Sequence, residues 1–269
     1  MRTTGLASLV AACLASSACF QMTTVVKVNG DGSGTIDHAL VITKAALAQL
    51  RNFAALGGSG RGQPIDLTSE DQARAMASAL GPGVTYVSST AIDTPVGQGR
   101  RAQYAFTDIS QLRISDQPSA DGLPTRGRSS LNARASDFTC TLTREPNGNA
   151  VLHINLPEMN FSGALGDAAI GNPPAAQQLA MVRSLLAGAR ISIGVEPAGH
   201  LVRTNSPFVD GERVTLLDVN LDQVLGNEAV IAKLQAATTP DEVKAALMDL
   251  PGLKIPLDRE VTIEFTPAK

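Results

Sequence analysis

The chain has no tryptophan, and aromatic residues make up only 3% of its 269 residues. A hydrophobic core must therefore be built from alanine, leucine, valine and isoleucine. Basic residues do not cluster either, since the longest run of lysine and arginine is the pair Arg100 and Arg101. With a formal net charge of −3 at pH 7, the chain lacks the basic patch that nucleic-acid binding requires. Nucleic acid is not an expected partner.

Sequence signatures of catalysis and of cofactor binding are also missing. Ser59 has glycine neighbours, but Arg61 stands where a nucleophile elbow needs its second glycine. The three histidines, His38, His153 and His200, are far apart and have no second histidine or cysteine at metal-ligand spacing. His38 falls on the apolar face of a predicted strand, where we expect a hydrogen-bonded core histidine. The sequence thus assigns no catalytic residue, no cofactor and no cofactor-binding residue.

The first 18 residues have the composition of an export signal. Arg2 gives this segment a positive charge, 5–14 carry no charge, and 15–18 are small residues before Cys19. The apolar run is too short for a membrane-spanning helix, which needs about 20 residues, and it is typical of a secretory signal peptide. We predict a signal peptide at 1–18 and a mature chain that starts at Cys19.

Cys19 allows a second interpretation of this segment, because bacterial lipoprotein signals end at a cysteine that receives acyl chains such as palmitate. Ser17 and Ala18 fit the two positions before that cysteine, whereas Ser16 stands where a larger aliphatic residue is usual. We predict that Cys19 is a lipid anchor, since more than one acyl chain is needed for stable membrane binding. Two alternatives stay open: secretion with Cys19 as an unmodified first residue, and acylation at Cys13 instead.

Cys140 is the cysteine that remains when the signal is removed and Cys19 is acylated. It alternates with Phe138 and Leu142 on the apolar side of a predicted strand. A free cysteine in such a position behaves as a small hydrophobic residue. We therefore expect Cys140 to be buried and to have no reactive or metal-binding role.

Periodic patterns divide the chain into hairpins and short helices. Strands are predicted at 21–28, 35–43, 84–92, 100–106, 138–156 (a hairpin), 190–196, 200–204, 213–219 and 261–266, and helices at 44–55, 69–80, 174–187 and 239–247. This order favours an α+β fold, in which a mainly antiparallel sheet is built from hairpins and short helices pack on one face.

About 250 residues follow the signal, which is enough for one large domain or two small ones. We predict a single α+β periplasmic domain at 19–269. Two parts of it, 20–115 and 137–269, repeat the order hairpin, helix, strand, strand, which indicates two similar halves. Between them, 116–136 lose all periodicity and are predicted to be a flexible loop.

The sharpest site-like pattern resembles an EF-hand calcium loop. Its oxygen-bearing residues at positions 1, 3, 5 and 9 are Asn29, Asp31, Ser33 and Asp37. Position 12, which supplies a bidentate glutamate in EF-hands, is Leu40, and the preceding residues alternate as a strand rather than a helix. A glycine-rich hairpin turn explains the same residues. We assign no metal site here and keep calcium as the alternative.

Two stretches near the C-terminal end resemble a known family. Residues 199–205, a strand ending at Asn205, lead through a turn into a second strand at 209–215, and this pattern resembles the LppM-like lipoprotein domain. The layout from Cys19 through a Thr/Val strand to the turn at 31–34 is similar to the start of many poorly characterised bacterial envelope lipoproteins. The resemblance implies a surface-tethered α+β module with a cavity for lipid, and it brings no catalytic residue.

Together these observations predict a lipid-anchored protein of the bacterial cell envelope that faces the periplasm or the cell surface. Its role is expected to be non-catalytic, either in binding or in structure. The expected partners are the membrane, through N-terminal acyl chains, and a lipid, another apolar ligand or an envelope protein. The alternatives are a freely secreted periplasmic protein and an envelope hydrolase whose carboxylates, such as Asp37 or Asp210, are gathered by the fold.

Overall fold

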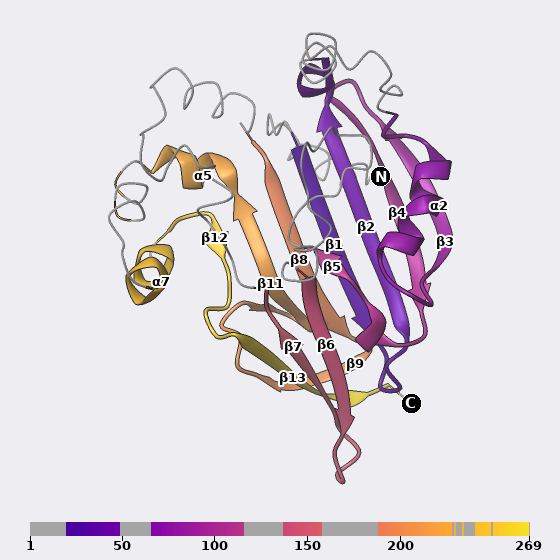
Figure 1. Cartoon of the computed structure of the whole chain (residues 1–269), viewed down its shortest axis with the longest axis vertical. Coiled ribbons are helices and arrows are strands. Elements are labelled where there is room, and N and C mark those ends of the chain that lie inside the picture. The colour runs from indigo at the N-terminus through magenta and orange to yellow at the C-terminus, as the bar shows by residue number, and fades with distance from the viewer. Residues whose placement is uncertain are drawn as a thin grey trace, which may run out of the picture.

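The computed structural model of the chain describes residues 20–48, 66–115, 137–157, 188–227, 229, 233, 240–248 and 250–268. These residues form an eight-stranded sheet and a five-stranded sheet (Figure 1). The large sheet contains β1 (Phe20–Val28), β2 (Gly34–Thr43), β3 (Thr85–Asp93), β4 (Gly97–Phe106), β8 (Arg190–Pro197), β10 (Val209–Asp210), β11 (Arg213–Asn220) and β12 (Leu253–Lys254). The small sheet contains β5 (Ile114–Ser115), β6 (Asp137–Arg144), β7 (Ala150–Asn155), β9 (Gly199–Thr204) and β13 (Glu260–Pro267).

The large sheet has the strand order β10-β11-β8-β1-β2-β4-β3, with β12 added to β11. Its strands pair antiparallel except at the centre, where β1 and β8 are parallel from Gln21 opposite Arg190 to Val28 opposite Pro197. β1 also pairs with β2 along its whole length, from Phe20 opposite Ile42 onwards. The sheet therefore joins strands from the N-terminal and C-terminal parts of the chain.

The two sheets share one hydrophobic core. The large sheet contributes Ile36, Tyr104 and Phe106, and the small sheet contributes Ile263 and Phe265, all of them buried. In Figure 1 the small sheet crosses the lower part of the large sheet. The strand order of the small sheet is β5-β6-β7-β13-β9. Each sheet thus covers apolar side chains of the other.

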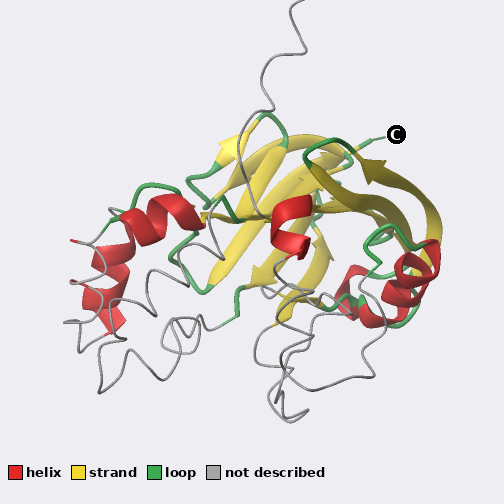
Figure 2. Cartoon of the chain, turned by 90° about the horizontal axis from the view of Figure 1, so that it is seen from above, coloured by secondary structure: helices red, strands yellow, loops and turns green. Residues whose placement is uncertain are grey.

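This arrangement corrects the predicted α+β class with helices packed on one face of an antiparallel sheet. Among the described residues, strands account for 53% and helices for 18%, so the described fold is mostly β. Figure 2 shows the strands layered in the middle and most of the helices at the sides. Alternating apolar residues identify a buried strand face, but the alternation is the same whether a helix or a second sheet covers that face. That ambiguity is the reason for the error.

The described helices are short. They are residues 44–48, α2 (Glu70–Ala79), the 3-10 turn η1 (Ile109–Gln111), α5 (Leu221–Gly226) and α7 (Pro240–Met248). The predictions at 69–80 and 239–247 are confirmed by α2 and α7. The helix predicted at 174–187 and the loop predicted at 116–136 lie outside the described residues.

Helix α2 begins and ends where the sequence supplies capping residues. The Ser69 hydroxyl accepts a hydrogen bond from the backbone N–H of Gln72 at 3.4 Å, which satisfies one of the free donors at a helix start. Ala73 is buried, and its carbonyl accepts a 2.9 Å bond from the Tyr104 hydroxyl on β4. After Leu80, Gly81 turns the chain with φ of 130°, a conformation that favours glycine. Helix α2 is thereby fixed beside β4.

The large sheet has two different ends. At what we call the β1 end, β1 begins, β2 and β11 finish, and the turn between β3 and β4 lies beside them. At the opposite end, which we call the turn end, β1 runs through a short turn at 29–33 into β2. The β6–β7 hairpin projects past the turn end (Figure 1, bottom). The described C-terminus is there too, since Ala268 N–H donates to Ala198 and Ala198 N–H donates to Val28.

Replacing Leu152 by alanine tests whether the sheets share one close-packed core. Leu152 lies on β7 and is buried between the sheets. We expect Leu152→Ala to lower the free energy of unfolding in urea by about 2–5 kcal/mol, because it leaves a cavity. The control Val202→Ala on β9, whose side chain is 47% exposed, should change it by less than about 0.5 kcal/mol. Equal effects of the two variants would contradict the shared core.

Candidate functional site

The predicted anchor Cys19 lies outside the described residues, but its place in the sequence is informative. The next residue, Phe20, is the first residue of β1 and already pairs with Ile42 on β2. From Gln21 onwards β1 also pairs with β8. Because consecutive Cα atoms are about 3.8 Å apart, any group on Cys19 is attached directly to the β1 end. No linker separates it from the central strand.

A turn between β3 and β4 stands next to this attachment point. The Thr94 backbone N–H donates to the Gly97 carbonyl at 2.9 Å, and the Gly97 N–H donates to the Thr94 hydroxyl at 3.0 Å. Val96 lies in this turn with its side chain 58% exposed. Its carbonyl accepts a 3.0 Å hydrogen bond from the Lys44 backbone N–H, and the Lys44 amine pairs with Asp93 at 2.9 Å. The turn therefore exposes the apolar Val96 next to the Lys44 amine.

The residues of the calcium-loop pattern lie on the turn end instead. Asn29 Nδ2 donates to the Ser33 hydroxyl at 2.9 Å, and Asp31 Oδ1 accepts from the Ser33 hydroxyl at 2.6 Å and from its backbone N–H at 3.0 Å. These bonds from Ser33 lower the pKa of the Asp31 carboxyl. Three of the four oxygen-bearing side chains thus bond to one another and brace the β1–β2 turn.

The fourth residue of that pattern, Asp37, lies along β2 rather than in the turn. Its carboxylate is 3.8 Å from the Lys27 amine, which is also 4.0 Å from Glu196 on β8. Asp210 lies on β10, four strands away in the order of the sheet. At about 4.8 Å per strand, the strands that carry the two carboxylates named for the alternative hydrolase are about 19 Å apart across the sheet. The fold does not bring them together.

His38 lies in the core with a polar neighbour. Its side chain is buried on β2, and Nδ1 is 3.0 Å from the Thr24 hydroxyl on β1, which is also buried. Burial lowers the pKa of His38 to about 4, so the imidazole is neutral at pH 7. The expectation of a hydrogen-bonded core histidine on the apolar face agrees with this geometry. A neutral, bonded imidazole costs much less to bury than a charged one.

The other two histidines connect strands at the surface. His153 on β7 pairs with Glu260 on β13, and His200 on β9 lies 2.9 Å from Glu212. Glu212 also accepts a hydrogen bond from the backbone N–H of Leu201, and this bond is the main cause of its lowered pKa. Both imidazoles therefore hold exposed carboxylates in place.

Glu264 on β13 joins three segments of the small sheet. Its carboxylate accepts a 2.7 Å hydrogen bond from Asn149 and another from Arg203 on β9. Asn149 and then Arg203 lower the pKa of Glu264.

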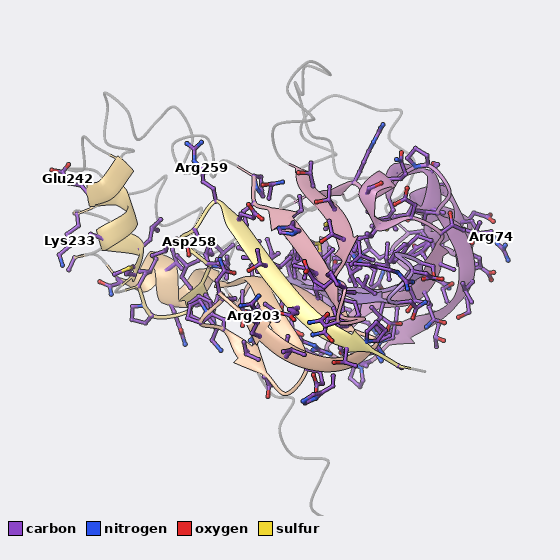
Figure 3. The ribbon with its side chains drawn as sticks, turned by 90° about the horizontal axis from the view of Figure 1, so that it is seen from below. Arg74, Arg203, Lys233, Glu242, Asp258 and Arg259 are labelled. Carbon is purple, nitrogen blue, oxygen red and sulfur yellow. The ribbon has the colours of Figure 1, made fainter. Side chains whose placement is uncertain are left out.

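Figure 3 shows that charged side chains are spread over the molecule, with Arg74 at one side and Lys233 and Glu242 at the other.

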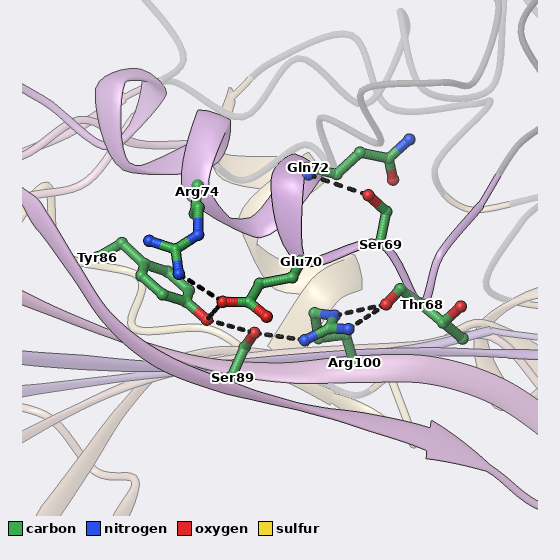
Figure 4. A network of polar contacts seen from close by, with 8 residues as sticks. All are labelled: Thr68, Ser69, Glu70, Gln72, Arg74, Tyr86, Ser89 and Arg100. Atoms are coloured by element: carbon green, nitrogen blue, oxygen red, sulfur yellow. Dashed lines mark hydrogen bonds and ion pairs between the residues drawn. The ribbon is translucent and has the colours of Figure 1, made fainter.

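A polar network links α2 to the edge of the large sheet (Figure 4). Glu70 accepts a 2.6 Å bond from Arg74 and a 3.0 Å bond from the Tyr86 hydroxyl. The bond from Arg74 is the largest cause of the lowered pKa of Glu70. The Arg74 guanidinium also lies 4.4 Å from the centre of the Tyr86 ring, a favourable cation–π distance.

The same network continues to Arg100. The sequence predicts a strand at this position but gives no indication of the hydrogen-bond partners of Arg100. Its guanidinium donates to the Thr68 carbonyl and to the Ser89 hydroxyl. Sequence reasoning missed these bonds because their members are far apart in the chain. They tie the segment before α2 to β3 and β4, so we assign the network a structural role.

Cys140 lies on β6 with its side chain buried in the shared core. Burial raises the pKa of its thiol to about 12, so almost no thiolate exists at pH 7. The structure thus places Cys140 on the apolar face, as its alternation with Phe138 and Leu142 predicts.

Within the described residues, no three side chains of His, Cys, Asp or Glu are grouped as metal ligands. No described helix is long and apolar enough to cross a membrane.

The neutral state of His38 predicts a pH dependence of stability. The folded pKa of about 4 lies below the usual 6.5, so the unfolded chain takes up a proton first as pH falls. The contribution of His38 to the free energy of unfolding is therefore complete above about pH 6.5 and is lost as the pH falls from 6.5 to about 4. Between pH 7.5 and 5 we expect a loss of about 2 kcal/mol from this group, measured by urea unfolding.

Two variants separate this effect from other titrations. His38→Gln should remove most of the loss between pH 7.5 and 5, whereas His200→Gln, at an exposed site, should retain it. An unchanged pH dependence in His38→Gln would show that another group is responsible.

Burial of Cys140 predicts slow thiol chemistry in the folded protein. A maleimide should modify Cys140 at least about 100-fold more slowly in the native state than in 6 M urea, since only thiolate reacts and the site is closed. The unfolded protein is the internal control for the reagent. Equal rates in the two states, followed by mass spectrometry, would contradict the buried position.

Comparisons with known proteins add one structural similarity. No protein-family model matches the chain, and no curated protein matches it. The chain is similar to one solved structure, the NMR structure of the folded domain of LppM from Mycobacterium tuberculosis. The TM-score is 0.31 and the sequence identity 10%, with 94% of this chain and 96% of that chain covered. At this level the similarity assigns neither a family nor a function.

Proposed function

We propose that the protein is a lipid-anchored protein of the bacterial cell envelope with a non-catalytic binding or structural role. The observation that carries the proposal is the segment 1–19, a charged start, an uncharged apolar run and small residues that end at Cys19. This is the composition of a secretory signal. The acyl chains on Cys19 would attach the domain to the membrane and place it on the periplasmic side or at the cell surface.

The position of β1 supports cleavage before Cys19. Pairing of β1 starts at Phe20 on one side and at Gln21 on the other. Removal of 1–18 would therefore leave every strand of both described sheets complete. A mature chain that starts at Cys19 keeps the whole described fold.

The polar contacts of the described residues support a non-catalytic role. Several of the histidines and carboxylates bond across strands, as His153 does to Glu260 and Glu264 does to Arg203. Asp37 bonds to Gln103 at 3.3 Å and lies beside Lys27. These partners are contributed by neighbouring strands, which is the usual arrangement for side chains that stabilise a sheet.

Cys19→Ala tests the anchor. The wild-type protein, expressed with its complete N-terminal sequence, should enter the detergent phase in Triton X-114 partitioning, and Cys19→Ala should stay in the aqueous phase. The matched control is Cys140→Ala, which removes the other cysteine of the mature chain and should behave as wild type. Intact mass spectrometry should show the added mass of acyl chains on wild type alone.

Two results would contradict the proposal. Equal aqueous partitioning of wild type and Cys19→Ala would favour a freely secreted protein. Loss of the acyl mass in Cys13→Ala but not in Cys19→Ala would place the anchor at Cys13.

A further inference from the structure

We infer that the β1 end of the large sheet faces the lipid surface and that the turn at Val96 is a second membrane contact. The inference rests on the proposed function, since it takes Cys19 as the acylated residue. It adds that the β1 end meets a phospholipid bilayer, and this contact sets the orientation of the domain.

The proposed anchor and the fold are adjacent in the chain. Cys19 is followed directly by Phe20, which is fixed in the ladder opposite Ile42. A tether of one residue allows the domain little freedom to swing away from the bilayer. Flexible linkers have this freedom because their end-to-end distance grows as about 5–6 Å times the square root of the number of residues. With no linker between Cys19 and Phe20, the corresponding end-to-end distance in this chain is close to zero.

Val96 lies beyond the same end of the large sheet as Phe20. Phe20 pairs with Ile42, and Ile42 pairs with Gln98 on β4. Val96 comes two residues before Gln98, so it reaches beyond this level at the end where β1 begins. β4 is two strands from β1, about 10 Å at the usual spacing. Phe20, the residue that follows the proposed anchor, and Val96 thus lie at the same end of the large sheet.

The turn between β3 and β4 combines an exposed apolar side chain with a lysine. The Val96 side chain is 58% exposed, and Lys44 beside it keeps its amine at the surface, where it pairs with Asp93. An apolar side chain flanked by a lysine suits the boundary between headgroups and acyl chains. A single valine adds little affinity, so the acyl chains provide the binding and the turn fixes the tilt.

The turn end should then point away from the membrane. β1 has nine residues, so its two ends are about 27 Å apart. The turn at 29–33 and the described C-terminus lie at the far end, and the β6–β7 hairpin extends beyond it (Figure 1). Pro146 at the tip of that hairpin is exposed. It serves as the matched position for a comparison with Val96.

Fluorescence quenching in membranes tests this orientation. The mature acylated protein, as Val96→Cys or as Pro146→Cys, is labelled with a thiol-reactive fluorophore and reconstituted into vesicles of phosphatidylethanolamine and phosphatidylglycerol. Lipids carrying a nitroxide near the headgroup act as the quencher. We expect a large loss of fluorescence for the label at 96 and no loss for the label at 146. Cys140 does not compete for the label because its thiol is buried.

The outcomes separate the two proposals. Equal quenching of both labels on a membrane-bound protein would overturn the orientation and leave the lipid anchor standing. A protein that remains in the supernatant after vesicle sedimentation would overturn the anchor itself. Protection of Cys140 from labelling shows in each sample that the variant is folded.

A linker variant tests the role of the short tether. Insertion of 12 glycine and serine residues between Cys19 and Phe20 allows an end-to-end distance of about 20 Å. Quenching at 96 should then fall towards the value at 146. Unchanged quenching at 96 would contradict the argument that the one-residue tether sets the orientation.

Discussion

The pairing of β1 on both sides is the constraint on which the rest of the structure depends. β1 holds β2, and through it β4 and β3, on one side, and it holds β8 and β11 on the other. The parallel pair of β1 and β8 joins the two parts of the chain. Without it the large sheet would divide into two smaller sheets, each with an unpaired edge, which proteins normally avoid.

Because aromatic residues are scarce, aliphatic side chains fill most of the core that the two sheets share, and they must pack at the density of protein interiors. The few large rings are used where they fit best: Tyr104 and Phe106 on β4 and Phe265 on β13 are all buried. The buried pair of Thr24 and His38 shows that this interior also accepts a polar contact when it is bonded.

Much of the local structure could be predicted from the sequence, and the assembly could not. Alternation located the hairpins, and Ser69 with the acids that follow it located α2. The partner of β1 is β8, and no pattern in either strand specifies the other, because parallel pairing depends on contacts between distant residues. The same reason hid the bonds of Arg100 to Thr68 and Ser89. For the candidate site, the sequence predicts Cys19 as the anchor, and only the structure shows that the central strand begins directly after it.

The parallel pair also has a consequence for the order of events in the life of the protein. Gln21 cannot meet Arg190 until the chain has been made as far as Arg190, and the last described strand, β13, is needed between β7 and β9. Folds dominated by such distant contacts form slowly. If the chain is exported as proposed, late closure of the sheets suits that route, because a chain that is still open can be threaded through a membrane.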